Sequence, residues 1–191
     1  MRPPQRRRRI PQRRRLFVGC EGESERGYGA FLTRLIEEQE LAVHLDMAVL
    51  QPGGGDPCAI VELAVQRIAQ KQKSRGEPYD RKIVFLDADR LGAVPDRDQR
   101  LLQISRREQL HLIWQRPCHE AMLLHHIDGC AHLAPPDSSA AVRELRRRWD
   151  DYRKGMPAAR LAERLDLDAV RRAAAVENDL SIFLIEIGLL P

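Results

Sequence analysis

Short apolar runs alternate with helix-like patterns four times along this chain, and no other feature restricts the fold as strongly. The strand-like runs cover residues 16–20, 41–52, 81–90 and 110–115, and helical spacing follows at 26–40, 57–73, 95–108 and 118–126. Asp56 is well placed to cap the second helix, with Pro57 at its first position. Strands that alternate with helices favour a parallel sheet covered on both faces. The sequence therefore predicts an α/β fold with about four parallel strands.

The remainder of the chain predicts one domain with two appendages. From Ser139 onward the pattern is helical only, with breaks at Pro157 and near Asn178. We expect an α/β core at 16–130, a helical extension at 131–191 packed on the same domain, and a disordered tail at 1–15. No apolar run approaches the roughly 18–20 residues of a membrane span, and no apolar stretch of signal-peptide length follows the first arginines. These features predict a cytoplasmic protein.

The charge of the chain is divided between its tail and its body. The net charge is +4, yet residues 1–15 alone hold eight arginines and no acid. Subtracting these eight charges leaves −4 for residues 16–191. A basic arm of this kind binds phosphate backbones through charge alone, so Arg13, Arg14 and Arg15 are candidate nucleic-acid contacts. The alternative is compositional bias, because arginine outnumbers lysine 28 to 4.

Acidic residues follow two of the predicted strands. Glu21 ends the first strand, and Glu25 lies one helical turn later; Asp87 and Asp89 end the third. The i, i+2 spacing of the aspartates puts both side chains on one side of a strand. In a parallel sheet, functional groups collect at the carboxyl ends of the strands. If the first and third strands are neighbours, these four carboxylates converge.

Converging carboxylates repel one another unless a cation neutralises them. Mg²⁺ or Mn²⁺, which prefer oxygen ligands, would remove this cost. Each acid also has an ordinary explanation: acids favour helix N-termini, which suffices for Glu23, and Asp89 can pair with Arg90 or Arg81. The combination of both acidic strand ends, in this order, favours a metal site.

Three segments resemble the RloB family: "CEGESE" at 20–25, "FLDADR" at 85–90 and "RPCHEAMLLHH" at 116–126. The resemblance runs from about Leu16 to His126, with a weaker helical likeness beyond, where "DYRKG" has the family's look. Family members usually carry a third block close to "NPCFEAWLLLH". Here Arg116 replaces the asparagine and His119 the phenylalanine, which leaves the role of this block open.

The resemblance implies a Toprim-like catalytic fold. By the family motifs, Glu21, Glu25, Asp87 and Asp89 are the metal ligands and catalytic acids, and Glu120 reaches the edge of the site. The family is implicated in bacterial defence against phage and mobile elements, often beside an ATPase. The resemblance therefore implies a nuclease that uses Mg²⁺ or Mn²⁺, acts on DNA or RNA, and has an ATPase partner of the AAA or ABC type.

Further side chains are candidates for substrate contacts. Arg90 and Lys82 are suited to stabilise a phosphate by charge, and His119 or His125 to act as a base or phosphate contact. A zinc site is disfavoured, because the histidines near Cys118 and Cys130 lack the paired spacing of structural zinc. The glycine loop at 53–55 has no lysine-serine sequel and is not a P-loop.

Two other function classes compete with hydrolysis of phosphodiester bonds. One is a non-catalytic module that binds nucleic acid or an ATPase, with the basic tail as its arm. The other is nucleotidyl transfer, which uses the same metal chemistry but generally needs further substrate domains. The presence of all four acids favours the hydrolase.

Overall fold

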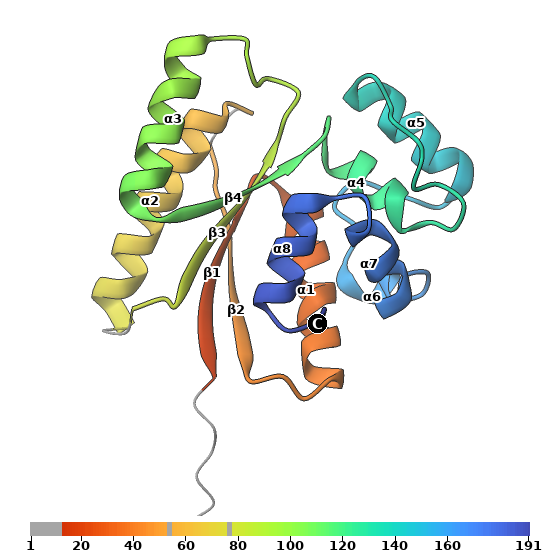
Figure 1. The fold of residues 1–191 in the computed structure, drawn as a ribbon, viewed down its shortest axis with the longest axis horizontal. Coiled ribbons are helices and arrows are strands. Elements are labelled where there is room, and N and C mark those ends of the chain that lie inside the picture. Colours follow the sequence, from red (N-terminus) through yellow and green to blue (C-terminus); the bar gives the residue numbers. More distant parts are fainter. Residues whose placement is uncertain (1–12, 53–54, 76–77) are drawn as a thin grey trace, which may run out of the picture.

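Four parallel strands form the sheet at the centre of the fold. The computed structural model describes residues 13–52, 55–75 and 78–191. The strands are β1 (Arg14–Cys20), β2 (Val43–Val49), β3 (Arg81–Asp87) and β4 (Leu110–Gln115), in the spatial order β2-β1-β3-β4 (Figure 1). All three pairings are parallel. The first and third strands are therefore neighbours, and the predicted parallel α/β fold is confirmed.

Alternate residues of each strand face two separate hydrophobic clusters. In β1, Leu16 and Val18 belong to the larger cluster, whereas Phe17 between them belongs to the smaller one. In β3, Phe85 and Val84 divide in the same way. This alternation follows from the period of two along a strand. Both faces of the sheet are therefore covered, as the nearly continuous apolar runs predict.

Helices α2 (Pro57–Arg75) and α3 (Pro95–Glu108) lie on one face, and α1 (Glu23–Glu38) and α4 (His119–His126) lie on the other (Figure 1). Helix α1 begins at Glu23, earlier than the start at Arg26 that the sequence pattern indicates. Its start is fixed by Glu25, whose Oε2 accepts the backbone N–H of Gly22 at 3.1 Å, the reciprocal half of a capping box.

The C-terminal region adds four helices to the face that carries α1 and α4. They are α5 (Ser138–Arg148), α6 (Ala158–Leu161), α7 (Leu167–Ala174) and α8 (Asn178–Glu186). The breaks predicted at Pro157 and near Asn178 fall at the starts of α6 and α8. Phe183 of α8 packs edge-to-face on Phe85 of β3, with ring centroids 5.4 Å apart. These helices therefore share one hydrophobic cluster with the sheet. In the described part of the chain, no helix has the length and apolarity that a membrane span requires.

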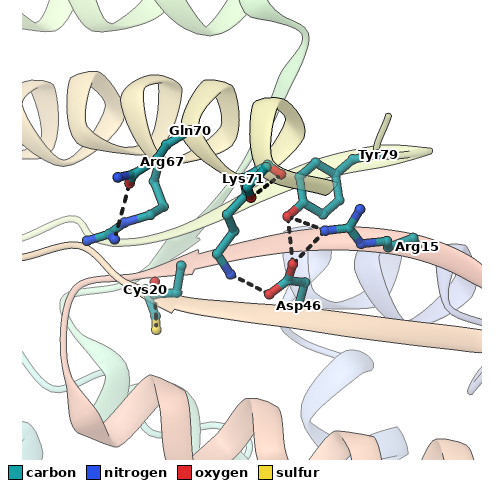
Figure 2. A network of polar contacts seen from close by, with 9 residues as sticks. Arg15, Cys20, Asp46, Arg67, Gln70, Lys71 and Tyr79 are labelled. Carbon is teal, nitrogen blue, oxygen red and sulfur yellow. Dashed lines mark hydrogen bonds and ion pairs between the residues drawn. The ribbon is translucent and has the colours of Figure 1, made fainter. Parts of the chain in front are cut away.

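A polar network fastens α2 to the opposite face of the sheet. Asp46 of β2 is 8% exposed and accepts hydrogen bonds from Tyr79 at 2.6 Å, Arg15 at 3.0 Å and Lys71 of α2. Figure 2 shows these three donors converging on the aspartate. The Arg15 guanidinium also lies 4.3 Å from the centroid of the Tyr79 ring. A buried carboxylate is tolerated here because it is surrounded by paired donors.

The first strand starts earlier than predicted, at Arg14 rather than Leu16. Arg14 pairs with Val43 and Arg15 with His44 in the ladder between β1 and β2. Arg14 also forms an ion pair with Glu186 of α8. Two arginines that the sequence assigns to the tail are therefore part of the sheet. The arginines from Arg2 to Arg9 lie outside the described residues, as do two of the three glycines at 53–55.

Candidate functional site: an acidic cleft at the carboxyl edge of the sheet

A cleft of about 350 Å³ opens where β1 and β3 end. Four of the five acids proposed from sequence line it, and each comes from a different element: the end of β1, the start of α1, the end of β3 and the start of α4. One lysine from the loop after α5 completes the charged lining. The lining residues are Glu21, Gly22, Glu23, Ser24, Glu25, Asp87, His119, Glu120, Lys154 and Gly155.

Asp87 has a strongly raised pKa in the cleft. Burial raises its pKa to about 8, and the negative charges of Glu25 and Glu21 push in the same direction. The backbone N–H of His119 opposes the shift by donating to Asp87 Oδ1 at 2.9 Å. Burial first, and the neighbouring acids second, therefore disfavour the charged form of Asp87.

Glu21 lies at the side of the cleft that faces the turn after β3. Burial raises its pKa, and Glu25 and Asp89 add to the rise, whereas the neighbouring Arg90 opposes it. Arg90 therefore lies within electrostatic reach of Glu21. Glu21 and Asp87 are both disfavoured as anions in this arrangement.

Asp89 occupies a different position from the one that strand geometry predicts. Strand β3 ends at Asp87, and Asp89 lies in the turn that follows. It is exposed, and Ser138 at the start of α5 donates its hydroxyl to Asp89 Oδ2 at 3.1 Å. The i, i+2 rule does not apply past the end of the strand, so Asp89 lies at the rim of the cleft while remaining within electrostatic reach of Glu21.

Glu120 is a buried acid of the cleft that has both a hydrogen-bond donor and a cation as partners. It is 2% exposed, and its Oε1 accepts the Tyr152 hydroxyl at 3.2 Å and lies 3.3 Å from Lys154 Nζ. Burial acts to raise the pKa of Glu120, but Lys154 opposes burial and the net pKa is lowered. Glu120 is therefore a charged, well-positioned carboxylate.

Lys154 and Tyr152 are functional candidates that the sequence pattern alone does not single out. Both belong to the "DYRKG" segment, whose family likeness assigns no role to either side chain. Two signals point to Lys154: that likeness, and its being one of only four lysines in a chain with 28 arginines. What the sequence does not show is that the loop after α5 folds back to the cleft, where the N–H of Gly155 donates to Ser24 Oγ at 2.9 Å.

His119 lines the cleft with a buried ring. The ring packs edge-to-face on Tyr28, with centroids 5.8 Å apart, and Gln115 Nε2 lies 2.7 Å from its Nδ1. Burial lowers the pKa of His119, which favours the neutral ring. With the Gln115 amide donating to Nδ1, the ring proton is on Nε2. Among the described residues, this nitrogen has no hydrogen-bond partner.

The other histidines near the cleft have their ring nitrogens engaged. His125 lies 2.8 Å from both Glu177 Oε1 and the carbonyl of Leu133. The ring nitrogens of His126 lie 2.9 Å from the Tyr28 hydroxyl and 3.0 Å from the Met122 carbonyl. Within residues 13–52, 55–75 and 78–191, no three His, Cys, Asp or Glu side chains form a ready-made metal-binding group.

Several of the proposed phosphate contacts lie at the opposite edge of the sheet. Lys82, near the start of β3, donates to the carbonyl of Glu108 at 2.6 Å, and Arg14 and Arg15 begin β1. Strand β1 has seven residues, so its two ends are separated by roughly 20 Å at about 3.3 Å per residue. These three side chains do not border the cleft. Arg13, which is exposed, directly precedes β1.

The fold and the cleft define a class: an α/β protein with a cluster of carboxylates at the carboxyl edge of a parallel sheet. Within that class, the model of the RloB-like protein family matches residues 16–181, so the chain belongs to this family. No curated protein and no solved structure matched the chain.

Proposed function

We propose that this chain is a metal-dependent phosphodiesterase of the Toprim type that hydrolyses DNA or RNA. The observation that carries the proposal is the convergence of Glu21, Glu25, Asp87 and Glu120 on one cleft. Burial and the repulsion of neighbouring acids raise the pKa of Asp87 to about 8, which a bound cation would reverse. Four of the five acids proposed from the sequence line this cleft, which supports the proposal.

The donor set fits a hard divalent cation. Carboxylate oxygens are the preferred ligands of Mg²⁺ and Mn²⁺, and Glu21, Asp87 and Glu25 supply them from three elements, with Asp89 at the rim. Bound there, the ion would polarise a phosphoryl oxygen and lower the pKa of a coordinated water. Glu25 also caps α1 through Gly22, which restricts its movement and keeps one carboxylate fixed.

Lys154 and Glu120 have complementary roles in this proposal. Lys154 lines the cleft and its side chain is largely exposed, so its ammonium group can contact the phosphate group of a substrate. Glu120, held by Tyr152, positions Lys154. It is also a candidate for the base that accepts a proton from the attacking water. Arg90, beside Glu21, is the second cation that can approach the phosphate.

The test is cleavage of mixed DNA and RNA substrates with Mn²⁺ or Mg²⁺, with EDTA as control. Glu21→Gln, Asp87→Asn and Asp89→Asn should each remove nearly as much activity as the triple variant, because residues that hold one ion do not contribute additively. Glu38→Gln, at the exposed end of α1, is the matched control and should retain full activity. Metal-dependent cleavage that persisted in Asp87→Asn would show that the acids were assigned wrongly.

The rival function is a non-catalytic module that binds nucleic acid or an ATPase. It is favoured by the lack, in the described residues, of a ready-made group of three metal ligands. Binding of substrate without turnover, with metal present and with any neighbouring ATPase added, would support this rival. The roles in anti-phage defence and with an ATPase partner follow from the family resemblance. They are tested by asking whether an ATPase encoded beside the gene copurifies with this chain.

A further inference from the structure

Helix α5 presents a stripe of arginines to solvent. Its buried residues are Ala141 and Leu145, and the opposite side carries Arg143, Arg146 and Arg147, all exposed. The spacing of i, i+3 and i+4 places these three side chains on one helical face. We call this surface the arginine face.

Among the described residues, most of the charge on the arginine face is not neutralised by a carboxylate. Arg147 lies 3.2 Å from Glu144, but its side chain is 73% exposed, and such a pair is weak in water. Among the described residues, neither Arg143 nor Arg146 forms an ion pair with a carboxylate. Arginines in a last helical turn are favoured by the helix dipole, which accounts for Arg146 and Arg147. It does not account for Arg143, in the middle of the helix.

Both ends of α5 are attached to the cleft. At its first residue, Ser138 donates to Asp89 at the rim. After its last residue the chain returns to the cleft, where Lys154 contacts Glu120 and Gly155 bonds to Ser24. Figure 1 shows α5 on the outer side of α4, away from α2 and α3. Helix α5 therefore lies between one contact to Asp89 and a loop that lines the cleft.

The acidic cleft by itself repels a nucleic acid, so binding requires a positively charged surface elsewhere on the protein. A phosphodiester backbone approaching a cleft lined by five acids and one lysine is repelled until a metal ion neutralises the acids. A surface of exposed arginines on a helix whose ends are linked to the cleft attracts the same backbone and raises its local concentration. The predicted contacts Arg14, Arg15 and Lys82 cannot serve this purpose, because they lie at the far edge of the sheet.

We propose that the arginine face of α5 binds the phosphate backbone of the nucleic acid and directs it to the acidic cleft. The direction toward the cleft rests on the proposed nuclease function, whereas the binding itself does not. Three arginines that bind three phosphates release about three counterions. On duplex DNA, this face should therefore contribute about −2.7 to the slope of log affinity against log salt concentration.

The experiment measures binding of labelled duplex DNA, single-stranded DNA and RNA to the full chain in EDTA, over a range of salt concentrations. The test variant replaces Arg143, Arg146 and Arg147 with Gln. The matched control replaces Arg67, Arg106 and Arg107 with Gln, removing the same charge from α2 and α3 on the opposite face of the sheet. Circular dichroism confirms that both variants are folded.

The test variant should bind at least one of the nucleic acids about tenfold or more weakly near 0.1 M salt, with a salt slope lower by about two to three, while the control changes little. Equal losses in both variants, or no loss in either, would overturn the inference. So would unchanged nucleic-acid binding in the test variant together with a loss of binding to acidic lipid vesicles, measured in parallel.

The two proposals can fail separately. Weaker binding in a protein that never cleaves would support the arginine face while refuting the nuclease. Cleavage with an unchanged KM in the test variant would support the nuclease while refuting the arginine face.

Discussion

The backbone N–H of His119 donates to Oδ1 of Asp87 at 2.9 Å, so the first turn of α4 holds the carboxylate that ends β3. This bond fixes the orientation of Asp87 without neutralising it. Burial, Glu25 and Glu21 still raise its pKa to about 8. The position of Asp87 is therefore set by α4, while burial and the neighbouring acids disfavour its charged form.

Asp87→Asn should be neutral or stabilising in metal-free protein. Asparagine retains the oxygen that accepts the His119 N–H but removes a charge that its neighbours disfavour. Urea unfolding in EDTA should give a free energy equal to or above that of the native protein. In native protein, Mn²⁺ at about 100 times its Kd should add about 2.7 kcal/mol. Asp87→Asn should lose this gain, and equal stabilisation of both proteins would remove the ion from this position.

His119→Phe should preserve both the fold and turnover. Phenylalanine is the residue that the family's third block usually carries at this position. It keeps the aromatic packing on Tyr28 and removes only an Nε2–H that is buried and has no hydrogen-bond partner among the described residues. His132→Phe, at an exposed position beyond α4, is the control. A kcat lower by on the order of a hundredfold in folded His119→Phe, the cost of losing a positioned donor to a reacting group, would contradict this expectation and give His119 a direct part in catalysis.

The pattern of apolar runs is sufficient to predict the sheet and the acidic edge. Leu16–Cys20 and the run ending at Asp87 are strands because both faces of a covered parallel strand are apolar, and parallel strands carry their carboxyl ends to one edge. Those two facts are enough to bring Glu21, Glu25 and Asp87 to the same edge. They fail for Asp89, because Ala88 donates its N–H to the carbonyls of Gln115 and Pro117 and turns the chain away from the strand direction.

The periodicity of apolar residues does not predict contacts between segments that are distant in the sequence. Lys154 enters the cleft because the loop after α5 folds back, and nothing local to that loop indicates its destination. Arg14 and Arg15 look like the end of a basic tail, yet their partners Glu186 and Asp46 are far away in the sequence. An arginine run can be assigned to a tail or to a strand only when such partners are known.

The Asp46 network should make stability depend on acid pH. Burial alone would raise the pKa of Asp46, but hydrogen bonds from Lys71, Tyr79 and Arg15 outweigh it and lower the pKa to about 2. A lowered pKa means that the stabilisation is complete above about pH 4, the pKa of an unfolded aspartate, and is lost as the pH falls toward 2.

Asp46→Asn should therefore cost about 3 kcal/mol at pH 7, the lower end for a broken buried ion pair, because Lys71 is partly exposed. The difference between native and variant unfolding free energies should shrink below about pH 4. Asp168→Asn, in an exposed pair with Arg171, is the control and should change stability little. A difference that stayed constant from pH 7 to pH 3 would contradict the ionic role of Asp46.

Two truncations should separate the basic arm from the first strand. Removing residues 2–12 deletes five arginines but none of the described contacts, so the unfolding free energy should not change. Nucleic-acid binding should weaken, and its salt slope should fall by up to about 4.5 if each arginine meets a phosphate of duplex DNA. Removing residues 2–15 also deletes the Arg14–Glu186 ion pair, the Arg15 bonds to Asp46 and Tyr79, and the first two ladder positions of β1. The longer truncation should therefore lower the melting temperature, which the shorter one leaves unchanged. An unchanged salt slope after removal of residues 2–12 would show that the arm makes no phosphate contacts, and the salt-dependent binding would then have to come from the rest of the chain, where the arginine face of α5, Lys154 and Arg90 are the proposed phosphate contacts.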